Sequence, residues 1–335
     1  MRQPTIRDVA EKAGVSKSLV SLVINNSPRV SDKSRQAVLT AASELGYRRN
    51  ATARSLVSRQ SQTIGVVMSS THEPFNAEAL NGVNQLIAPE GYRAFVQLGR
   101  HDRSAERQAI ESFLEIRVDA LILLGNELPT KELEELSRVV PIGLVGRHIK
   151  SSIIDVVAKD EQLGSTLAVE HLFDLGHRAI AHIDGGPGVA FRDRANGYRQ
   201  AMKAHDLEPH VISGEILAGG GAVGPEALLS KAGNLPTAIF ASSDLATFGA
   251  RDALQKHGLR IPQDVSLVGY NDTHLGRLLY QGLTTISQAG RKMGMQAAEL
   301  VMARLRDADR PAQNVVVPPS LIVRQSTAPP PAPGH

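Results

Sequence analysis

The polarity pattern begins with a short stretch that has the spacing of two helices. The run TIRDVAEKAGVSKSLVSLVINN starts at Thr5, a helix-capping residue type, and Asp8 follows three residues later as in a capping box. Gly14 comes after the apolar-periodic run, where the left-handed end of a helix favours glycine, and Ser16 can cap a second helix. Two short helices joined by so tight a turn predict a helix-turn-helix.

The second helix has one apolar and one polar face. Val20, Val23 and Ile24 follow the i, i+3, i+4 spacing of a buried stripe. The opposite side carries short polar residues, a lysine and one leucine: Lys17, Ser18, Ser21, Leu22 and Asn25. Short polar side chains on an exposed helix suit base edges and phosphates in the major groove, so this helix is expected to read DNA. Leu22 is either an ordinary surface leucine or an apolar contact to a thymine methyl.

A third helix completes a small helical core. Ser31 caps it, Val38, Ala41 and Leu45 are expected to face inward, and Gly46 ends it. Charge supports the same interpretation of this region. Residues 1–60 hold 11 Lys and Arg against 4 Asp and Glu, whereas the remainder holds 26 basic and 30 acidic residues. A basic head on a mildly acidic body is the distribution expected for phosphate neutralisation at one end of the chain.

From residue 62 onward, short apolar runs alternate with helical stretches. Buried strands are predicted at 64–68, 120–124, 180–184, 238–242 and 265–270. Helices are predicted near 76–88, 103–116, 160–175, 190–205, 223–232, 243–257 and 289–306. This alternation predicts an α/β body of parallel sheets covered by helices, with ligands bound outside the carboxyl ends of the strands.

Composition narrows the class of protein. The 335 residues suffice for a small head and a two-lobed body, and 42% of them are hydrophobic. The absence of cysteine excludes disulfides, thiolate metal sites and a cysteine nucleophile. We expect no metal, no cofactor and no catalytic residues. Without an apolar signal stretch or a membrane-length apolar segment, a soluble cytoplasmic protein with no membrane partner is expected. The Pro-rich tail, 328–335, is expected to be disordered.

Several motifs occur in a characteristic order along residues 4–327. They are TIRDVAEKAGVS, NATARSL, HLFDLGHRAIAHIDG, RANGYRQAM, PTAIFASSDLATFGARDAL, GLRIPQDVSLVGYND, LTTISQ and LIVRQST. With them the chain resembles the lactose-repressor/galactose-repressor (LacI/GalR) family of bacterial transcriptional regulators. The resemblance implies a homodimer that binds operator DNA and a sugar-like small-molecule effector. It also implies a two-lobed, periplasmic-binding-protein-like body of doubly wound parallel sheets, with three chain crossings between the lobes.

The resemblance gives the domain boundaries and the DNA contacts. It divides the chain into a helix-turn-helix domain (1–49), a hinge helix and linker (50–60), an effector-binding and dimerisation domain (61–327) and the tail (328–335). Within the hinge, Leu56 would wedge between base pairs of the minor groove, or else pack in a linker. The residues expected to contact DNA are Thr5, Ser16, Lys17, Ser18, Ser21, Leu22, Asn25, Asn50, Ala53, Arg54 and Leu56.

The resemblance also implies an effector site. Its expected residues are Ser69, Phe75, Asn76, Arg194, Asp244, Asn271 and Gln288. Planar polar groups and an aromatic face suit polyol recognition. Gly146 and Asn271 stand where relatives often carry Asp, and Ser243 stands where Asn is common. Having lost carboxylates, the site suits a neutral sugar by default or an anionic sugar derivative held by Arg194. Asp244 is either a ligand contact or a helix cap, and Asp160 is expected to cap its own helix.

Other classes of protein compete with this interpretation. Gly219, Gly221 and Gly224 spell G-x-G-x-x-G, and Asp244 follows 20 residues after the last glycine, as in a dinucleotide-binding fingerprint. A nicotinamide-linked enzyme is therefore an alternative, although a glycine run also makes a simple turn and the histidines are scattered. A second alternative is a regulator controlled by a protein corepressor. A third, a periplasmic sugar-binding protein, conflicts with the DNA-reading head. The leading hypothesis is a repressor on a palindromic operator.

Overall fold

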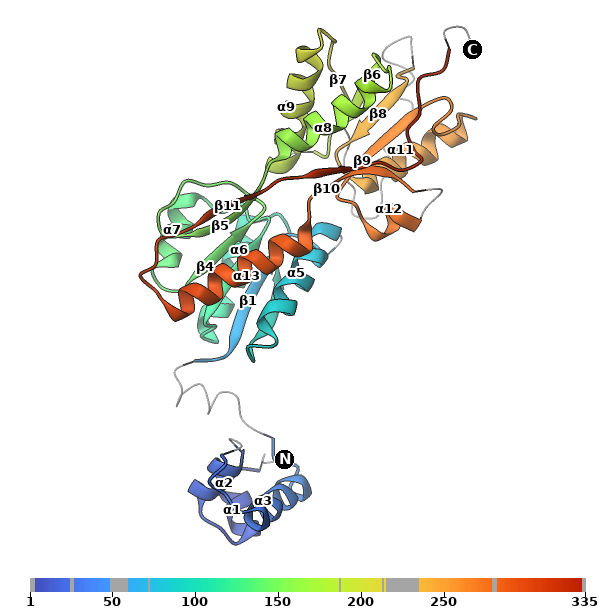
Figure 1. Cartoon of the computed structure of the whole chain (residues 1–335). Helices are drawn as coiled ribbons and strands as arrows, with labels where there is room; N and C mark the ends of the chain where they lie inside the picture. The colour runs from blue at the N-terminus through green and yellow to red at the C-terminus, as the bar shows by residue number, and fades with distance from the viewer. Residues whose placement is uncertain are drawn as a thin grey trace. The chain divides into compact units, whose positions relative to one another are not determined.

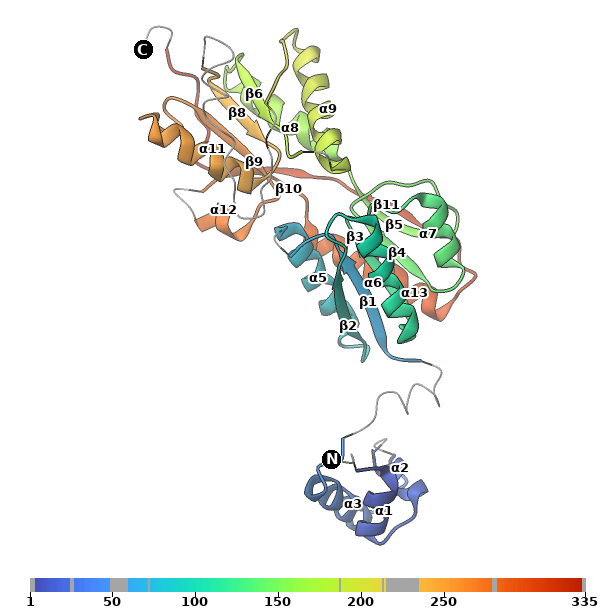
Figure 2. The same cartoon turned by 180° about the vertical axis from the view of Figure 1, so that it is seen from behind.

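The computed structural model describes residues 4–24, 27–48, 60–71, 73–186, 188–212, 214, 235–278 and 282–332. The chain divides into two units, residues 1–61 and residues 62–335. In the described residues the first unit holds three helices, and the second holds two sheets with their covering helices (Figures 1 and 2). Among the described residues, no helix combines the length and the apolar character needed to cross a bilayer.

The head contains α1 (Ile6–Ala13), α2 (Lys17–Ile24) and α3 (Asp32–Glu44). The predicted capping box is present, because Thr5 and Asp8 bond each other's backbone N–H groups. Gly14 adopts a left-handed conformation with φ of 65° and ends α1. The Leu19 N–H donates to Ser16 Oγ over 3.2 Å, so Ser16 caps α2 as predicted.

The three helices enclose the small core that the sequence predicts. Val20, Val23, Val38 and Ala41 are buried, together with Val9. Ile24 and Leu45 are partly buried against the same cluster. Ser31 Oγ accepts the Ser34 N–H over 3.3 Å and so caps α3. Local capping and one apolar stripe per helix are therefore enough to account for this unit.

The described part of the body contains two six-stranded sheets with equivalent strand orders. The first has the order β2–β1–β3–β4–β5–β11 and the second has the order β7–β6–β8–β9–β10–β12. The first sheet comprises β1 (Thr63–Met68), β2 (Arg93–Leu98), β3 (Ala120–Leu124), β4 (Ile142–Val145), β5 (Asp155–Lys159) and β11 (Asn314–Val317). The second comprises β6 (Ile180–Ile183), β7 (His210–Ile212), β8 (Ala238–Ala241), β9 (Ser266–Tyr270), β10 (Thr284–Ser287) and β12 (Ser320–Ile322). Neighbouring strands are parallel except for β12, which pairs antiparallel with β10.

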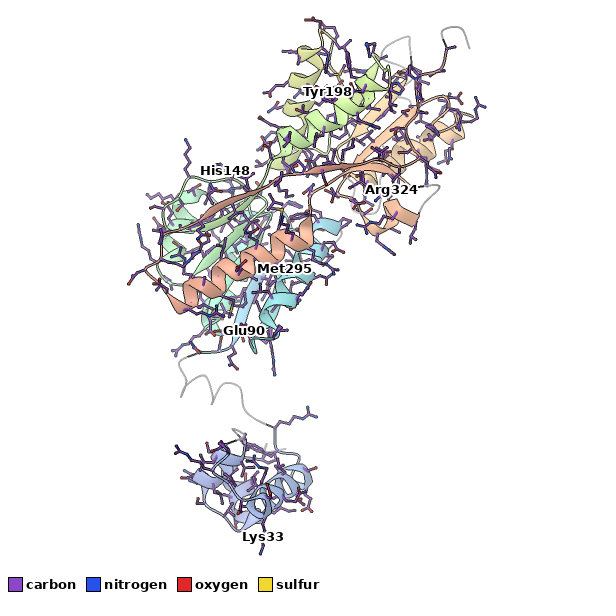
Figure 3. The ribbon with its side chains drawn as sticks, viewed as in Figure 1. Lys33, Glu90, His148, Tyr198, Met295 and Arg324 are labelled. Atoms are coloured by element: carbon purple, nitrogen blue, oxygen red, sulfur yellow. The ribbon has the colours of Figure 1, made fainter. Side chains whose placement is uncertain are left out.

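Helices cover both faces of each sheet. On the first sheet, α5 (Pro74–Ile87) and α13 (Gly290–Arg306) share one apolar cluster, and α6 (Arg103–Glu115) and α7 (Thr130–Ser137) share the other. On the second sheet, α8 (Glu161–Asp174) and α9 (Val189–Ala204) cover one face and α11 (Asp244–Lys256) the other; α12 (His274–Leu278) follows β9. Tyr198 of α9 (Figure 3) anchors its face, because its buried hydroxyl donates to the Ile180 carbonyl over 2.8 Å. The predicted doubly wound lobes are confirmed.

The chain passes between the two sheets three times, as the resemblance implies. The crossings lie between β5 and α8, between β10 and α13, and between β11 and β12. The last two return the C-terminal part of the chain to the first sheet and then to the second. A strand from the C-terminal part of the chain therefore completes each sheet: β11 is an edge strand of the first and β12 an edge strand of the second.

The structure confirms the five predicted strands and adds others. Predicted helices other than that at 223–232 match α5, α6, α8, α9, α11 and α13 to within a few residues, and Asp160 caps α8 as expected. The strands β2, β4, β5, β10, β11 and β12 and the helices α7 and α12 were not predicted from the sequence pattern. The helix predicted at 223–232, the glycines at 219–224 and the hinge residues Asn50, Ala53, Arg54 and Leu56 lie outside the described residues, as does Asn25.

The prediction that the tail is disordered from residue 328 is wrong at its start. The Ala328 carbonyl accepts a hydrogen bond from His177 Nε2 over 2.8 Å, and its N–H donates to Ser266 Oγ over 3.0 Å. Burial lowers the pKa of His177, which keeps the imidazole neutral and able to accept and donate within this network. The start of the tail is thus hydrogen-bonded to the lobe of the second sheet, although its Pro-rich composition predicted a segment without fixed contacts.

Two glycines allow α5 and α13 to cross at unusually short range. A Cβ atom at Gly82 would collide with the Arg291 carbonyl, and one at Gly294 would collide with the Ala79 carbonyl. Both obstacles are backbone atoms of the facing helix, which cannot rotate away. The two helices cover one face of the first sheet, and α13 immediately follows the second crossing. The spacing of the two helices therefore fixes the position of the chain at the end of that crossing.

We expect Gly294→Ala to lower the free energy of unfolding of the body by about 1–3 kcal/mol, because the added methyl forces the helices apart. The sign is diagnostic, since alanine at an unhindered helical site would stabilise by about 0.5–1 kcal/mol. Urea denaturation monitored by circular dichroism measures the change. Glu299→Ala, on the exposed side of the same helix, is the matched control and should change stability little. Equal stability of the two variants would refute the tight crossing.

Candidate functional site

The outward face of α2 in the head presents the predicted DNA-reading residues. Lys17 and Ser18 are exposed and Ser21 is partly exposed, whereas Val20 and Val23 lie in the core. Leu22 is 40% exposed, so this leucine is not needed for the head's own core. The polar arc and the apolar side chain in its middle are therefore available to a groove of DNA.

Two further residues predicted to contact DNA already have structural roles. The side chains of Thr5 and Ser16 accept the backbone N–H groups that begin α1 and α2. A capping oxygen fixes the end of its helix, and the helix N-terminus it leaves at the surface attracts anions such as phosphate. Their contact with DNA stays a prediction.

In the body, Ser69, Glu73 and Asn76 form a polar group beyond the end of β1. Asn76 is buried, and its Nδ2 donates to Ser69 Oγ over 3.0 Å and to the Ser70 carbonyl over 2.9 Å. Its Oδ1 is buried without a hydrogen-bond partner. Glu73 pairs with His101 at 2.9 Å. Although burial raises the pKa of Glu73, the His101 hydrogen bond and charge lower it overall, so this carboxylate is ionised near neutral pH.

Three charged side chains meet where the chain first passes between the sheets: Lys159 ends β5, Glu161 begins α8 and Arg194 lies on α9. We call them the buried ion cluster. Arg194 Nε donates to Glu161 Oε2 over 2.9 Å and Nη2 to Oε1 over 3.1 Å, a bidentate pair. Lys159 Nζ lies 3.5 Å from Glu161 Oε1. The side chains are only 10%, 5% and 4% exposed, in chain order.

Aromatic rings and a backbone carbonyl hold the cations of this cluster. Lys159 Nζ lies 3.7 Å from the centre of the Phe75 ring, and the Arg194 guanidinium lies 3.9 Å from that of Tyr270. Arg194 Nη1 also donates to the Ser242 carbonyl. These contacts connect the predicted residues Phe75 and Arg194 through two residues that the sequence analysis did not select, Lys159 and Glu161.

The charges of the cluster stabilise one another. Burial alone would raise the pKa of Glu161, but the Arg194 and Lys159 charges lower it to about 2. Burial lowers the pKa of Lys159, and the nearby carboxylates oppose that shift. The ionised Glu161 therefore depends on both cations, and each cation depends on Glu161.

Asn271 and Gln288 form a second polar pair of predicted residues. Gln288 Nε2 donates to Asn271 Oδ1 over 2.5 Å, and Gln288 Oε1 is buried without a partner. Asn271 has a φ of 110°, a backbone conformation that non-glycine residues rarely adopt. It directly follows Tyr270, the ring beneath Arg194, so this pair adjoins the buried ion cluster along the chain.

Asp244, which the sequence left as either a ligand contact or a helix cap, bonds to two other segments of the protein. Ser243, and not Asp244, caps α11, with its side chain accepting the Ala246 N–H over 3.1 Å, so the capping interpretation is wrong. The Asp244 carboxylate instead accepts the Thr285 hydroxyl over 2.6 Å and the Thr273 N–H over 2.7 Å. Both oxygens are thus bonded to protein groups, and Asp244 ties the loop after β9 to β10. Its contact with an effector stays a prediction.

The site residues that the sequence analysis missed carry no local signal. Glu161 appears in the sequence as one acidic residue at the start of a helix, beside the predicted cap Asp160. Its partner Arg194 is 33 residues away and belongs to the next helix. Lys159 resembles a surface lysine at the end of a strand. Their pairing arises from the three-dimensional arrangement of β5, α8 and α9, which no spacing rule describes.

Two family models match the chain. The model of bacterial regulatory proteins of the lacI family matches residues 5–50, and that of a periplasmic binding protein-like domain matches residues 169–327. The ribose operon repressor of Haemophilus influenzae is 34% identical over 327 residues, which cover 96% of this chain and 98% of that protein. The HTH-type transcriptional regulator GalR of Salmonella typhimurium is 34% identical over 336 residues, 99% of this chain and 98% of that one.

Solved structures agree with these matches. The crystal structure of the lac repressor dimer bound to operator and the anti-inducer ONPF superimposes with a TM-score of 0.83 at 28% identity, covering 98% of this chain and 100% of that one. The relatives are transcriptional regulators, so the chain is not an enzyme and the nicotinamide-linked alternative is wrong. The chain belongs to the lacI family of bacterial regulatory proteins: it is a DNA-binding transcriptional repressor controlled by a small-molecule effector.

Proposed function

We propose that the protein represses transcription in the cytoplasm as a homodimer on a palindromic operator, and that a sugar or sugar derivative bound by the body controls it. The observation that carries this proposal is the outward face of α2, with Lys17, Ser18 and the exposed Leu22 on a head whose core is complete without them. Two such heads related by a two-fold axis would read two half-sites of a palindrome.

The hinge is the second element of the proposal. Asn50, Ala53, Arg54 and Leu56 lie outside the described residues, so their role rests on the NATARSL motif and its family resemblance. Wedging Leu56 into the minor groove would cost a few kcal/mol of unstacking, offset by the contacts that a bent duplex allows. Specific binding would then require both a groove-reading head and a deformable operator centre.

The dimer is supported by an apolar edge of the first sheet. Strand β2 pairs only with β1 in the described sheet, and Phe95, Val96 and Leu98 on it are 47%, 42% and 36% exposed. An apolar edge strand left open to water promotes association, and natural proteins usually cover one. A second copy of the chain would cover this edge by two-fold symmetry. The structural relative described above is itself a dimer.

The effector is assigned to five polar residues and one aromatic residue around the first two crossings. Ser69, Phe75, Asn76, Arg194, Asn271 and Gln288 come from the ends of β1, β9 and β10 and from α5 and α9. Loops after the carboxyl ends of parallel strands are where doubly wound sheets bind ligands. A ligand that fits one arrangement of the lobes better than another would change DNA affinity by the same coupling free energy, typically 1–3 kcal/mol.

Selection of bound duplexes from a random pool at near-physiological salt tests the proposed operator. We expect the wild-type protein to enrich a two-fold palindrome. Leu56→Ala should lose this enrichment while keeping salt-sensitive non-specific binding, because the head and its charges remain. Leu22→Ala should keep the palindrome but relax the preference at one base pair of each half-site. Binding by the wild type that simply fades with salt, with no enriched sequence, would contradict the proposal.

Charge placed on the β2 edge tests the dimer. Val96→Glu should raise the dimer dissociation constant by about 30-fold or more, because a buried interface position is worth about 2 kcal/mol or more when disrupted. Sedimentation velocity across a dilution series measures this constant. Val139→Glu makes the same change at an apolar residue that is 74% exposed elsewhere on the body, and it should leave the dimer intact. Equal dimer stability of both variants would exclude the β2 edge as the interface.

A further inference from the structure

The guanidinium that the sequence analysis assigned to an anionic effector already has a counter-ion. Glu161 engages Arg194 through both carboxylate oxygens, and the Ser242 carbonyl accepts from a third nitrogen. The pair is bidentate, which is the arrangement by which an arginine would hold a phosphate or a carboxylate of a ligand. An anionic ligand would therefore compete with Glu161 for the same nitrogens.

Carboxylates accompany the cations around this position. Lys159 and Arg194 are positive, and Glu161 and Glu73 are negative; Glu73 is close enough to stabilise the charged forms of both cations, and it also pairs with His101, whose pKa it raises. An added anion would compete with these carboxylates for the same cations. Displacing Glu161 carries a cost, because its carboxylate would remain in a buried place without its partner. A neutral ligand changes no charge and leaves the buried ion cluster intact.

Buried polar atoms without a hydrogen-bond partner lie nearby. Two are the carbonyl oxygens Asn76 Oδ1 and Gln288 Oε1, which are acceptors, and two are the hydroxyls of Ser242 and Tyr270, which can donate or accept. The Asn76 amide is oriented by its other end, because Nδ2 donates to the Ser70 carbonyl, and Gln288 Nε2 donates to Asn271 Oδ1. A buried carbonyl oxygen without a donor is costly, so these two positions favour a ligand that supplies O–H or N–H groups.

We propose that Glu161 sets the charge specificity of the effector site: as a permanent internal counter-ion of Arg194, it selects uncharged, hydroxyl-bearing effectors and rejects their phosphorylated or carboxylated analogues. The proposal rests on the proposed function, since it concerns the effector site of that regulator. It favours the neutral alternative of the sequence analysis and assigns the choice to a residue outside the predicted site. Arg194 then acts as an oriented hydrogen-bond donor stacked on the Tyr270 ring, and not as a free positive charge.

A paired ligand panel tests the selectivity of the wild-type protein. Neutral pentoses, hexoses, disaccharides and polyols are each compared with the corresponding phosphate, aldonic acid or uronic acid, by thermal shift and then by isothermal titration calorimetry. We expect at least one neutral compound to bind, and its anionic counterpart to bind at least 10-fold more weakly. Tighter binding of an anionic member than of its neutral counterpart would overturn the proposal, and so would no binding by the entire neutral panel.

The variant Glu161→Gln tests the assigned residue. The amide keeps the size of the side chain but removes its charge, so Arg194 gains room for an external anion. We expect the ratio of neutral to anionic affinity to fall at least 10-fold. If the variant is unfolded alone, an anionic compound that supplies the missing charge should restore its folded circular-dichroism spectrum. An unchanged ratio, or no refolding with any anion, would remove Glu161 from this role.

Glu170→Gln is the matched control. Glu170 lies on the same helix, α8, and pairs with His205 at the surface, so the change removes the same charge away from the buried ion cluster. Its affinity ratio should equal that of the wild type. Operator binding by each variant, measured by the selection described above, separates the two proposals. Failure of the ligand panel with intact operator binding overturns only the charge specificity, whereas loss of sequence-specific operator binding by the wild type overturns the proposed function.

Discussion

The body depends on burying an arginine, a glutamate and a lysine together where the chain first passes between its two sheets. Removing such charges from water costs several kcal/mol each, and only close partners offset that cost. The end of β5, the start of α8 and the middle of α9 must therefore hold fixed positions, since they carry Lys159, Glu161 and Arg194. The Tyr270 ring and the Ser242 carbonyl bring the ends of β9 and β8 to the same place.

The C-terminal part of the chain is held by a separate charge group of the same kind. Asp155, at the start of β5, is buried and accepts from Arg304 Nε and Arg310 Nη1, each over 2.8 Å. These bonds attach the end of α13 and the segment before β11 to the strand whose other end carries Lys159. Strand β5 is therefore anchored by charge at both ends, and the close approach of Gly294 to α5 fixes the helix between them.

The sequence predicted what depends on local spacing and missed what depends on distant pairing. Caps at Thr5, Ser16 and Asp160, the core face of α2 and five apolar strands are short-range features, and the structure confirms them. Strand β2 was missed because its exposed, mixed residues lack the apolar run of a central strand. The partnership of Glu161 with Arg194 was missed because no periodicity relates residues on successive helices of a finished lobe.

The unpaired carbonyl oxygens of Asn76 and Gln288 belong to segments other than the first crossing, where the buried ion cluster is. This separation suits a ligand-controlled change of conformation. The buried ion cluster flanks the first crossing, and its three charged groups are paired with one another. Gln288 lies on the second crossing and Asn76 at the start of α5, and each has a carbonyl oxygen without a donor. Donors of a bound effector would satisfy both oxygens only when these two segments are correctly spaced. Since a ligand shifts an equilibrium only through such differential contacts, an effector bound at the proposed site would bias the position of the second crossing.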